Sequence, residues 1–217
     1  MLLYGFNMKL LFIFLLQINL LYALSINDSL LKIHATIVPK ISQMDYKFKE
    51  KIKNNSINIA IYYNKIHYKN ALSLEKQIYA KYKNGIQNYN INVRLLLYEN
   101  TNKQKYKATI CYLFPATKNQ ISEQIKNAAI NKSLTFSYLE SDLKYGVMLS
   151  VKIGANVKPI INLEAIKAND ITLRPILLDI SLIYRKLGKK SEFLKNTDKI
   201  NYYSLSYYFN KYNKSVK

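Results

Sequence analysis

The side chains able to do metal or acid–base chemistry are few in this sequence. His34 and His67 are its only histidines, and neither has a second ligand residue at the spacing that metal sites use. Each falls in or beside a segment with a helical pattern, so we expect both to be surface or helix-capping residues. The histidines therefore give no support to a metal centre, and we expect no cofactor.

Two carboxylate pairs could in principle supply an acid and a base: Glu140 with Asp142, and Glu164 with Asp170. Both lie near expected turns or helix starts, where a carboxylate interacts favourably with the helix dipole, so we interpret them as capping residues. With five glycines the chain has no phosphate-binding loop or dinucleotide fingerprint, and no serine lies in a nucleophile elbow. These observations predict a protein that is not an enzyme.

Cys111 is the single cysteine, so no disulfide can form within the chain. It lies in residues 109–114, a β-branched and aromatic run that predicts a buried strand, where cysteine behaves as a small hydrophobe. We expect an inert, buried thiol. A redox role for Cys111 is the alternative, and it is the one candidate site residue.

The N-terminus has the pattern of a secretory signal. Lys9 is the only charge before an almost wholly apolar run over residues 10–22, and Ala23 ends that run. A basic start, about 7–15 apolar residues and a small exit residue define a signal peptide. The run is shorter than the roughly 20 residues that span a bilayer, and Gln17 and Asn19 interrupt it. We predict a signal peptide over residues 1–23 and export to the periplasm, with a retained membrane anchor as the alternative.

The net charge of +20 would ordinarily suggest nucleic acid or an anionic membrane as a partner. Nearly all of this charge is lysine, whereas recognition of phosphates and bases favours arginine. The lysines also occur with abundant Asn, Ile and Tyr, as the coding bias of an AT-rich genome would produce. We predict a solvated lysine surface and no nucleic-acid partner. Salt-sensitive duplex binding at physiological salt would overturn this.

Hydrophobic periodicity predicts a single α/β domain over residues 24–187. Helical patterns cover residues 28–44, 68–83, 117–131 and 173–187, strand patterns cover residues 57–63, 91–98, 108–114 and 134–138, and a hairpin pattern covers residues 147–163. This order predicts a mixed sheet built from two successive β-α-β units plus a C-terminal hairpin, with helices packed on the sheet. Asp28 and Ser29 are expected to cap the first helix and Pro39 to bend or break it. The lysine- and tyrosine-rich tail over residues 188–217 is expected to be disordered or an appended helix.

Three segments in a fixed order carry a family resemblance. The first is CYLF at residues 111–114, and the second is YGVM at residues 145–148, which opens a hairpin that returns through INLEA at residues 161–165. The third is ITLRPILL at residues 171–178, which enters the last helix. Over roughly residues 28–187 the chain resembles the YfiR-like family of periplasmic proteins. It departs from the family pattern in having no Trp-Pro after the first helix, and no glycine after the first strand.

The resemblance implies a non-catalytic periplasmic regulator that binds an inner-membrane signalling protein and restrains a diguanylate cyclase. The alternative is a periplasmic small-ligand receptor, because two β-α-β units in succession are similar to one lobe of a solute-binding protein. Such a lobe binds its ligand at the strand ends, beside helix N-termini. Whether the protein forms a homo-oligomer stays open.

Overall fold

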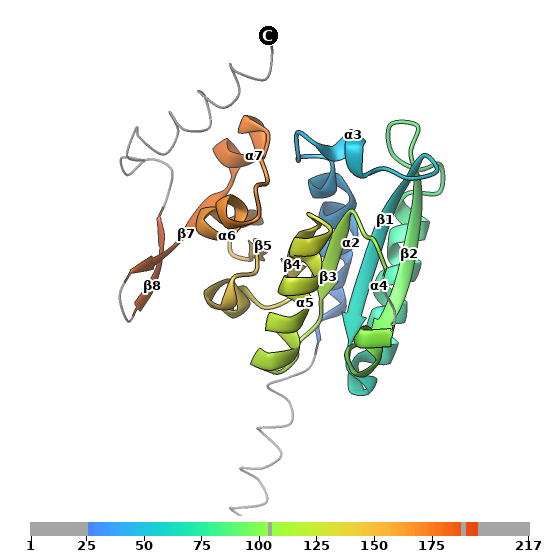
Figure 1. The fold of residues 1–217 in the computed structure, drawn as a ribbon, viewed down its shortest axis with the longest axis horizontal. Coiled ribbons are helices and arrows are strands. Elements are labelled where there is room, and N and C mark those ends of the chain that lie inside the picture. Colours follow the sequence, from blue (N-terminus) through green and yellow to red (C-terminus); the bar gives the residue numbers. More distant parts are fainter. Residues whose placement is uncertain (1–25, 104–105, 188–189, 195–217) are drawn as a thin grey trace, which may run out of the picture.

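The computed structural model describes residues 26–103, 106–187 and 190–194. All of the strands in these residues belong to one sheet. The sheet is mixed, has eight strands and follows the order β2-β1-β3-β4-β5-β6-β7-β8 (Figure 1). This confirms the predicted α/β class, with a single mixed sheet and helices packed on it. The predicted signal peptide lies outside the described residues. Among the described helices, none combines the length and apolar character needed to cross a membrane.

The first four strands pair in parallel. Their bounds are Ser56–Tyr63 for β1, Asn90–Leu97 for β2, Ile110–Leu113 for β3 and Leu134–Ser137 for β4. Helix α4 (Tyr68–Lys81) connects β1 to β2, and helix α5 (Lys118–Ile130) connects β3 to β4. The two predicted β-α-β units are therefore confirmed. Every residue of β3 and β4 is buried, as expected for central parallel strands covered on both faces.

The predicted hairpin is formed by β5 (Leu149–Lys152) and β6 (Lys158–Asn162), which pair antiparallel. Strand β5 itself is parallel to β4. Beyond β6, the sheet continues through β7 (Leu182–Leu187) in parallel and β8 (Lys190–Leu194) antiparallel. The first described part of the predicted tail is thus a strand, and residues 195–217 lie outside the described residues.

The predicted helix over residues 173–187 is wrong in its second half. Helix α7 spans only Pro175–Ile180, with the proline in its first turn as predicted. Ser181 then adopts extended backbone angles (φ −100°, ψ 157°), and the chain continues as β7. Strand β6 pairs with residues 182–184 and β8 pairs with residues 183–187, so tertiary hydrogen bonding prevails over the helical spacing of the apolar residues in this segment.

Helices cover both faces of the sheet. Helices α2 (Asp28–Ser42) and α4 pack together on one face, and α5 lies on the other, in front of the sheet in Figure 1. The shorter helices are α3 (Phe48–Lys51), η1 (Lys65–His67), η2 (Tyr98–Lys103), η3 (Glu140–Tyr145) and α6 (Leu163–Ala168). Because strands β1 to β5 are parallel, their amino ends all lie near α3 and their carboxyl ends lie at the opposite end of the sheet. We call these two ends of the sheet the amino edge and the carboxyl edge.

The cap of the first helix lies one residue earlier than predicted. Asn27, rather than Asp28 or Ser29, is the N-cap residue, and its side chain accepts hydrogen bonds from the backbone N–H groups of Ser29 and Leu30. Pro39 lies inside α2 and does not end it, since the helix continues to Ser42.

Candidate functional site

The carboxyl edge contains the topological switch point of the sheet. Strand β1 has β2 on one side and β3 on the other, while α4 and α5 lie on opposite faces. In open α/β sheets, ligands bind outside the carboxyl ends of the strands at such a point. In this chain the switch point is bordered by residues 64–67 after β1 and by residues 115–117 after β3.

Side chains of the protein itself join the two loops at this switch point. The Asn64 amide donates to the carbonyl of Pro115 (3.4 Å), and the Gln120 amide donates to Oδ1 of Asn64 (3.0 Å). Gln120 also completes a capping box with Thr117, whose backbone N–H donates to Gln120 Oε1 (3.1 Å). A small ligand entering between β1 and β3 would have to displace these hydrogen bonds.

Exposed apolar side chains line the same edge. Ile66 in η1 is 81% exposed and Tyr68 at the start of α4 is 49% exposed. In the turn after β5, Ile153 and Val157 are also exposed. Parallel pairing of β1, β3, β4 and β5 brings these two groups to one edge of the sheet. We name Ile66, Tyr68, Ile153 and Val157 the carboxyl-edge surface.

Polar groups lie beside this surface. Lys65 forms an ion pair with Glu99 (3.2 Å) next to Ile66, and Lys152 forms one with Glu140 (2.9 Å) next to Ile153. Exposed apolar groups bordered by polar ones are the composition of protein-binding surfaces. The carboxyl edge therefore combines exposed apolar side chains with neighbouring ion pairs.

His34 is a core residue, so the prediction that it lies on the surface is wrong. Its side chain is fully buried, and its Nδ1 shares a hydrogen bond of 2.6 Å with the Tyr112 hydroxyl. The rings of Tyr112, Phe136 and Tyr138 meet it edge-on, with centroids 5.2–5.6 Å away. Burial lowers the pKa of His34 to about 3, so the imidazole is neutral at physiological pH.

His67 is also buried, and the prediction of a surface residue fails for it as well. It occupies the N-cap position of α4, but its side chain makes no capping hydrogen bond. Its ring stacks on Phe114 instead, and burial lowers its pKa. Within the described ranges, no group of three or more His, Cys, Asp or Glu side chains is arranged to hold a metal ion.

The first carboxylate pair lies at a helix start, as predicted, but no side-chain capping hydrogen bond forms there, so the predicted capping role is wrong. Glu140 and Asp142 lie in the first turn of η3. Asp142 is buried, accepts a hydrogen bond from the Ser137 hydroxyl (2.5 Å), and has its pKa raised by burial.

The second pair is divided between the two ends of α6. Glu164 lies in the first turn of α6, as predicted, but Asp170 follows the helix in left-handed backbone conformation (φ 52°). Asp170 pairs there with Lys47 and Lys132 at the amino edge, so its predicted capping role is wrong.

Cys111 lies on β3 and is buried, which confirms the predicted buried strand. Burial raises the pKa of its thiol to about 12, which leaves almost no thiolate at neutral pH. We expect the folded protein to react with a disulfide reagent at least about a thousandfold more slowly than the urea-unfolded chain. Timed thiol labelling with and without urea measures this ratio. Fast labelling of the folded protein would restore the redox interpretation.

Comparisons with known proteins do not identify a family for this chain. No protein-family model matches the chain, and no curated protein matches it. One similar solved structure is a conserved domain protein from Vibrio cholerae, with 14% identity, a TM-score of 0.49, and coverage of 70% of this chain and 59% of that one. Another is an ABC domain in complex with L-Trp from Streptococcus pneumoniae, with 9% identity, a TM-score of 0.44, and coverage of 66% and 60%. The chain therefore spans less than two thirds of either structure, and neither likeness assigns a family or a ligand.

Proposed function

We propose that this protein is an exported, non-catalytic binding protein of the periplasm. Its carboxyl-edge surface binds a membrane signalling protein. The family resemblance suggests that this partner is the periplasmic portion of a diguanylate cyclase. The observation that carries the proposal is the exposure of Ile66 and Ile153, with Tyr68 and Val157, along one edge of the sheet. Apolar anchors on a rigid scaffold are what a protein interface requires.

The placement of the reactive groups favours binding over catalysis. His34, Cys111 and Asp142 have pKa values shifted by burial. The side chains of all three residues are buried, so a substrate at the carboxyl edge could not reach them. A catalytic group must reach the proton that it transfers. These three groups are therefore better explained by packing than by turnover.

The hydrogen bonds at the switch point favour a protein partner over a small ligand. Hydrogen bonds through Asn64 and Gln120 already join the loops after β1 and β3. A thermal-shift screen distinguishes the two functions, because a ligand that binds only the folded protein raises its melting temperature. A clear rise with one class of solute would replace the proposed function by that of a small-ligand receptor.

Charged substitutions in the carboxyl-edge surface are expected to abolish regulation while leaving the fold intact. In the native host, deletion of the gene should raise intracellular cyclic di-GMP, and restoring the intact gene should reverse the rise. The variant Ile66→Asp with Ile153→Asp should fail to reverse it, because a carboxylate at an apolar interface costs at least about tenfold in affinity at each site. Both side chains are exposed, so the free energy of unfolding should change by less than about 1 kcal/mol.

The matched control is Ile180→Asp, which places the same charge on α7, where the isoleucine is 54% exposed. This control should restore cyclic di-GMP to the level given by the intact gene. If the double variant restores regulation as well as the control does, the carboxyl-edge surface is not the binding site. If deletion leaves cyclic di-GMP unchanged while the cyclases are expressed, the diguanylate cyclase is not the partner.

A further inference from the structure

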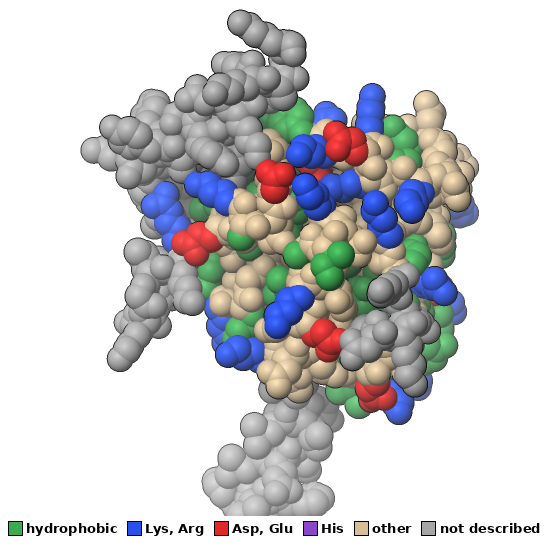
Figure 2. Space-filling view, viewed as in Figure 1, with side chains coloured by type: hydrophobic (Ala, Val, Ile, Leu, Met, Phe, Trp, Pro, Cys, Tyr) green, Lys and Arg blue, Asp and Glu red, His purple; other side chains and the backbone are tan. Residues whose placement is uncertain are grey.

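Several cationic side chains of this protein lie together at the amino edge of the sheet. Most residues of this edge precede a parallel strand or follow α5. Arg174 lies there because its backbone N–H donates to the carbonyl of Met44. We name as the basic edge the side chains of Lys47, Lys49, Lys53, Lys107, Lys132 and Arg174. Figure 2 shows Lys and Arg side chains gathered at the end of the molecule where α3 lies.

Few carboxylates balance the basic edge. Asp45 is buried and forms an ion pair with Lys51 inside the structure. Asp170 is about half exposed and lies between the ammonium groups of Lys47 (3.5 Å) and Lys132 (3.4 Å). Glu50 is the other carboxylate of this edge, and it is exposed on α3 beside Lys49. A positive potential therefore remains over the edge.

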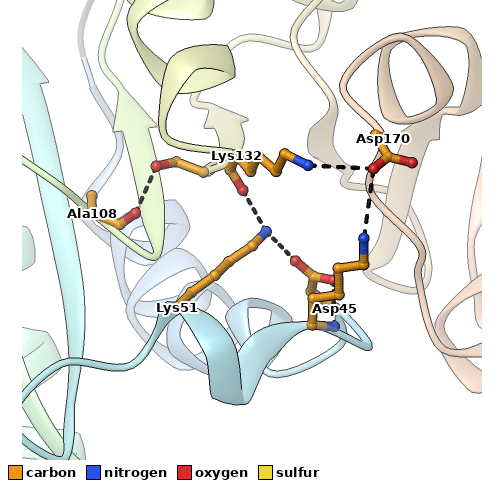
Figure 3. A network of polar contacts seen from close by, with 7 residues as sticks. Asp45, Lys51, Ala108, Lys132 and Asp170 are labelled. Atoms are coloured by element: carbon orange, nitrogen blue, oxygen red, sulfur yellow. Dashed lines mark hydrogen bonds and ion pairs between the residues drawn. The ribbon is translucent and has the colours of Figure 1, made fainter.

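The basic edge is held rigidly by contacts between distant segments (Figure 3). Lys51 donates both to Asp45 and to the backbone carbonyl of Lys132, which joins α3 to the turn after α5. Residues 44–46 and 172–174 are joined by two backbone hydrogen bonds of 2.7 and 2.8 Å. The lysines thus project from a preorganised platform, which lowers the entropy lost on binding.

Two exposed isoleucines accompany the lysines. Ile130 is the last residue of α5, two positions before Lys132, and is 81% exposed. Ile176 follows Arg174 by two positions and is 59% exposed. Aliphatic side chains beside a cationic surface fit the boundary between the headgroups and the acyl chains of a bilayer.

We propose that the basic edge binds the surface of an anionic lipid bilayer. Lysines attract anionic headgroups as point charges, and Ile130 and Ile176 enter the headgroup boundary. Duplex nucleic acid fits less well, because it has no apolar layer comparable to the acyl chains of a bilayer and the edge has one arginine among its cations. This surface lies at the opposite end of the sheet from the carboxyl-edge surface, so it would leave that surface facing away from the membrane.

Sedimentation with lipid vesicles tests the proposal on the exported protein. Vesicles of phosphatidylcholine and phosphatidylglycerol, mixed at about 2 to 1, should bind the protein, and vesicles of phosphatidylcholine alone should bind it far more weakly. Replacing Lys49, Lys53 and Lys107 with Gln should lower the partition coefficient on the order of 100-fold, at about fivefold for each lysine. Replacing Ile130 and Ile176 with Ser should lower it about tenfold.

The matched control removes the same charge from the other end of the sheet, by replacing Lys65, Lys69 and Lys118 with Gln. Its partition coefficient should stay within about threefold of the unmodified protein, because these lysines face away from the bilayer. All variants share one N-terminal segment, so any affinity of that segment for lipid cancels in the comparison. Thermal melting should show all variants folded, since every replaced lysine is exposed.

Three results would overturn the proposal. Equal losses in the two lysine variants would mean that binding follows net charge and not the basic edge. An unchanged partition coefficient in the isoleucine variant would mean that nothing enters the headgroup boundary. Duplex DNA binding at the same salt, as tight as vesicle binding and equally weakened by the basic-edge variant, would identify a nucleic-acid surface instead.

Discussion

Replacing Lys51 with Met is expected to lower the free energy of unfolding by about 3–5 kcal/mol, because it leaves a buried carboxylate without its cation. The Lys51 side chain is 9% exposed and that of Asp45 is 1% exposed. Without Lys51, Asp45 would retain the backbone N–H of Lys47 as a donor (2.9 Å), and the carbonyl of Lys132 would lose its ammonium donor. For a chain of this size the loss corresponds to a fall of roughly 6–20 °C in melting temperature.

Urea unfolding at neutral pH measures this effect, and two further variants identify its cause. Lys132→Met removes an exposed partner of Asp170, so it should cost less than about 1 kcal/mol. Adding Asp45→Leu to Lys51→Met removes both buried charges and should recover most of the loss. A Lys51→Met protein that unfolds like the unmodified one would show that the ion pair contributes nothing to stability.

The central sheet could be predicted from the sequence because its signals are local. Strands β1, β3 and β4 are short runs of β-branched and aromatic residues, and the helices between them have apolar residues at helical spacing. Strand β7 could not be predicted in this way. Apolar residues at positions 173, 177, 180 and 184 fit a helix, while Ile183 and Tyr184 suit a strand equally well. Pairing with β6 and β8 decides between these structures, and the partner strands lie elsewhere in the sequence.

The burial of His34 had a signal in the sequence that our prediction did not use. Leu31, His34, Ala35 and Val38 follow one another at helical spacing, and all four are buried on the inner face of α2. Its hydrogen-bond partner, Tyr112, lies 78 positions further along the chain, so no local pattern identifies that contact. The carboxyl-edge surface and the basic edge also combine distant residues, and only the parallel order of the strands brings them together.

The burial of His34 is expected to make the protein less stable as the pH falls below about 6.5. The unfolded chain binds a proton at its ordinary pKa of 6.5, whereas the folded protein keeps His34 neutral down to a pKa of about 3. The contribution of neutral His34 to the free energy of unfolding is therefore fully present above pH 6.5. Below pH 6.5 this contribution is lost at about 1.4 kcal/mol per pH unit. About 2 kcal/mol should be lost between pH 7.5 and pH 5, as measured by urea unfolding at a series of pH values.

Other groups titrate in the same range, so a variant must isolate the contribution of His34. The lowered pKa of His67 acts in the same direction, while the raised pKa values of Asp142 and Glu75 act in the opposite one. Among the titratable groups, His34→Phe removes His34 alone. It also lowers the free energy of unfolding by about 1–3 kcal/mol at every pH, because it leaves the Tyr112 hydroxyl unpaired. The difference between the two proteins should therefore shrink by about 2 kcal/mol from pH 7.5 to pH 5. A difference that stays constant over this range would mean that the folded protein admits a proton to His34, and that its aromatic surroundings open more readily than their packing implies.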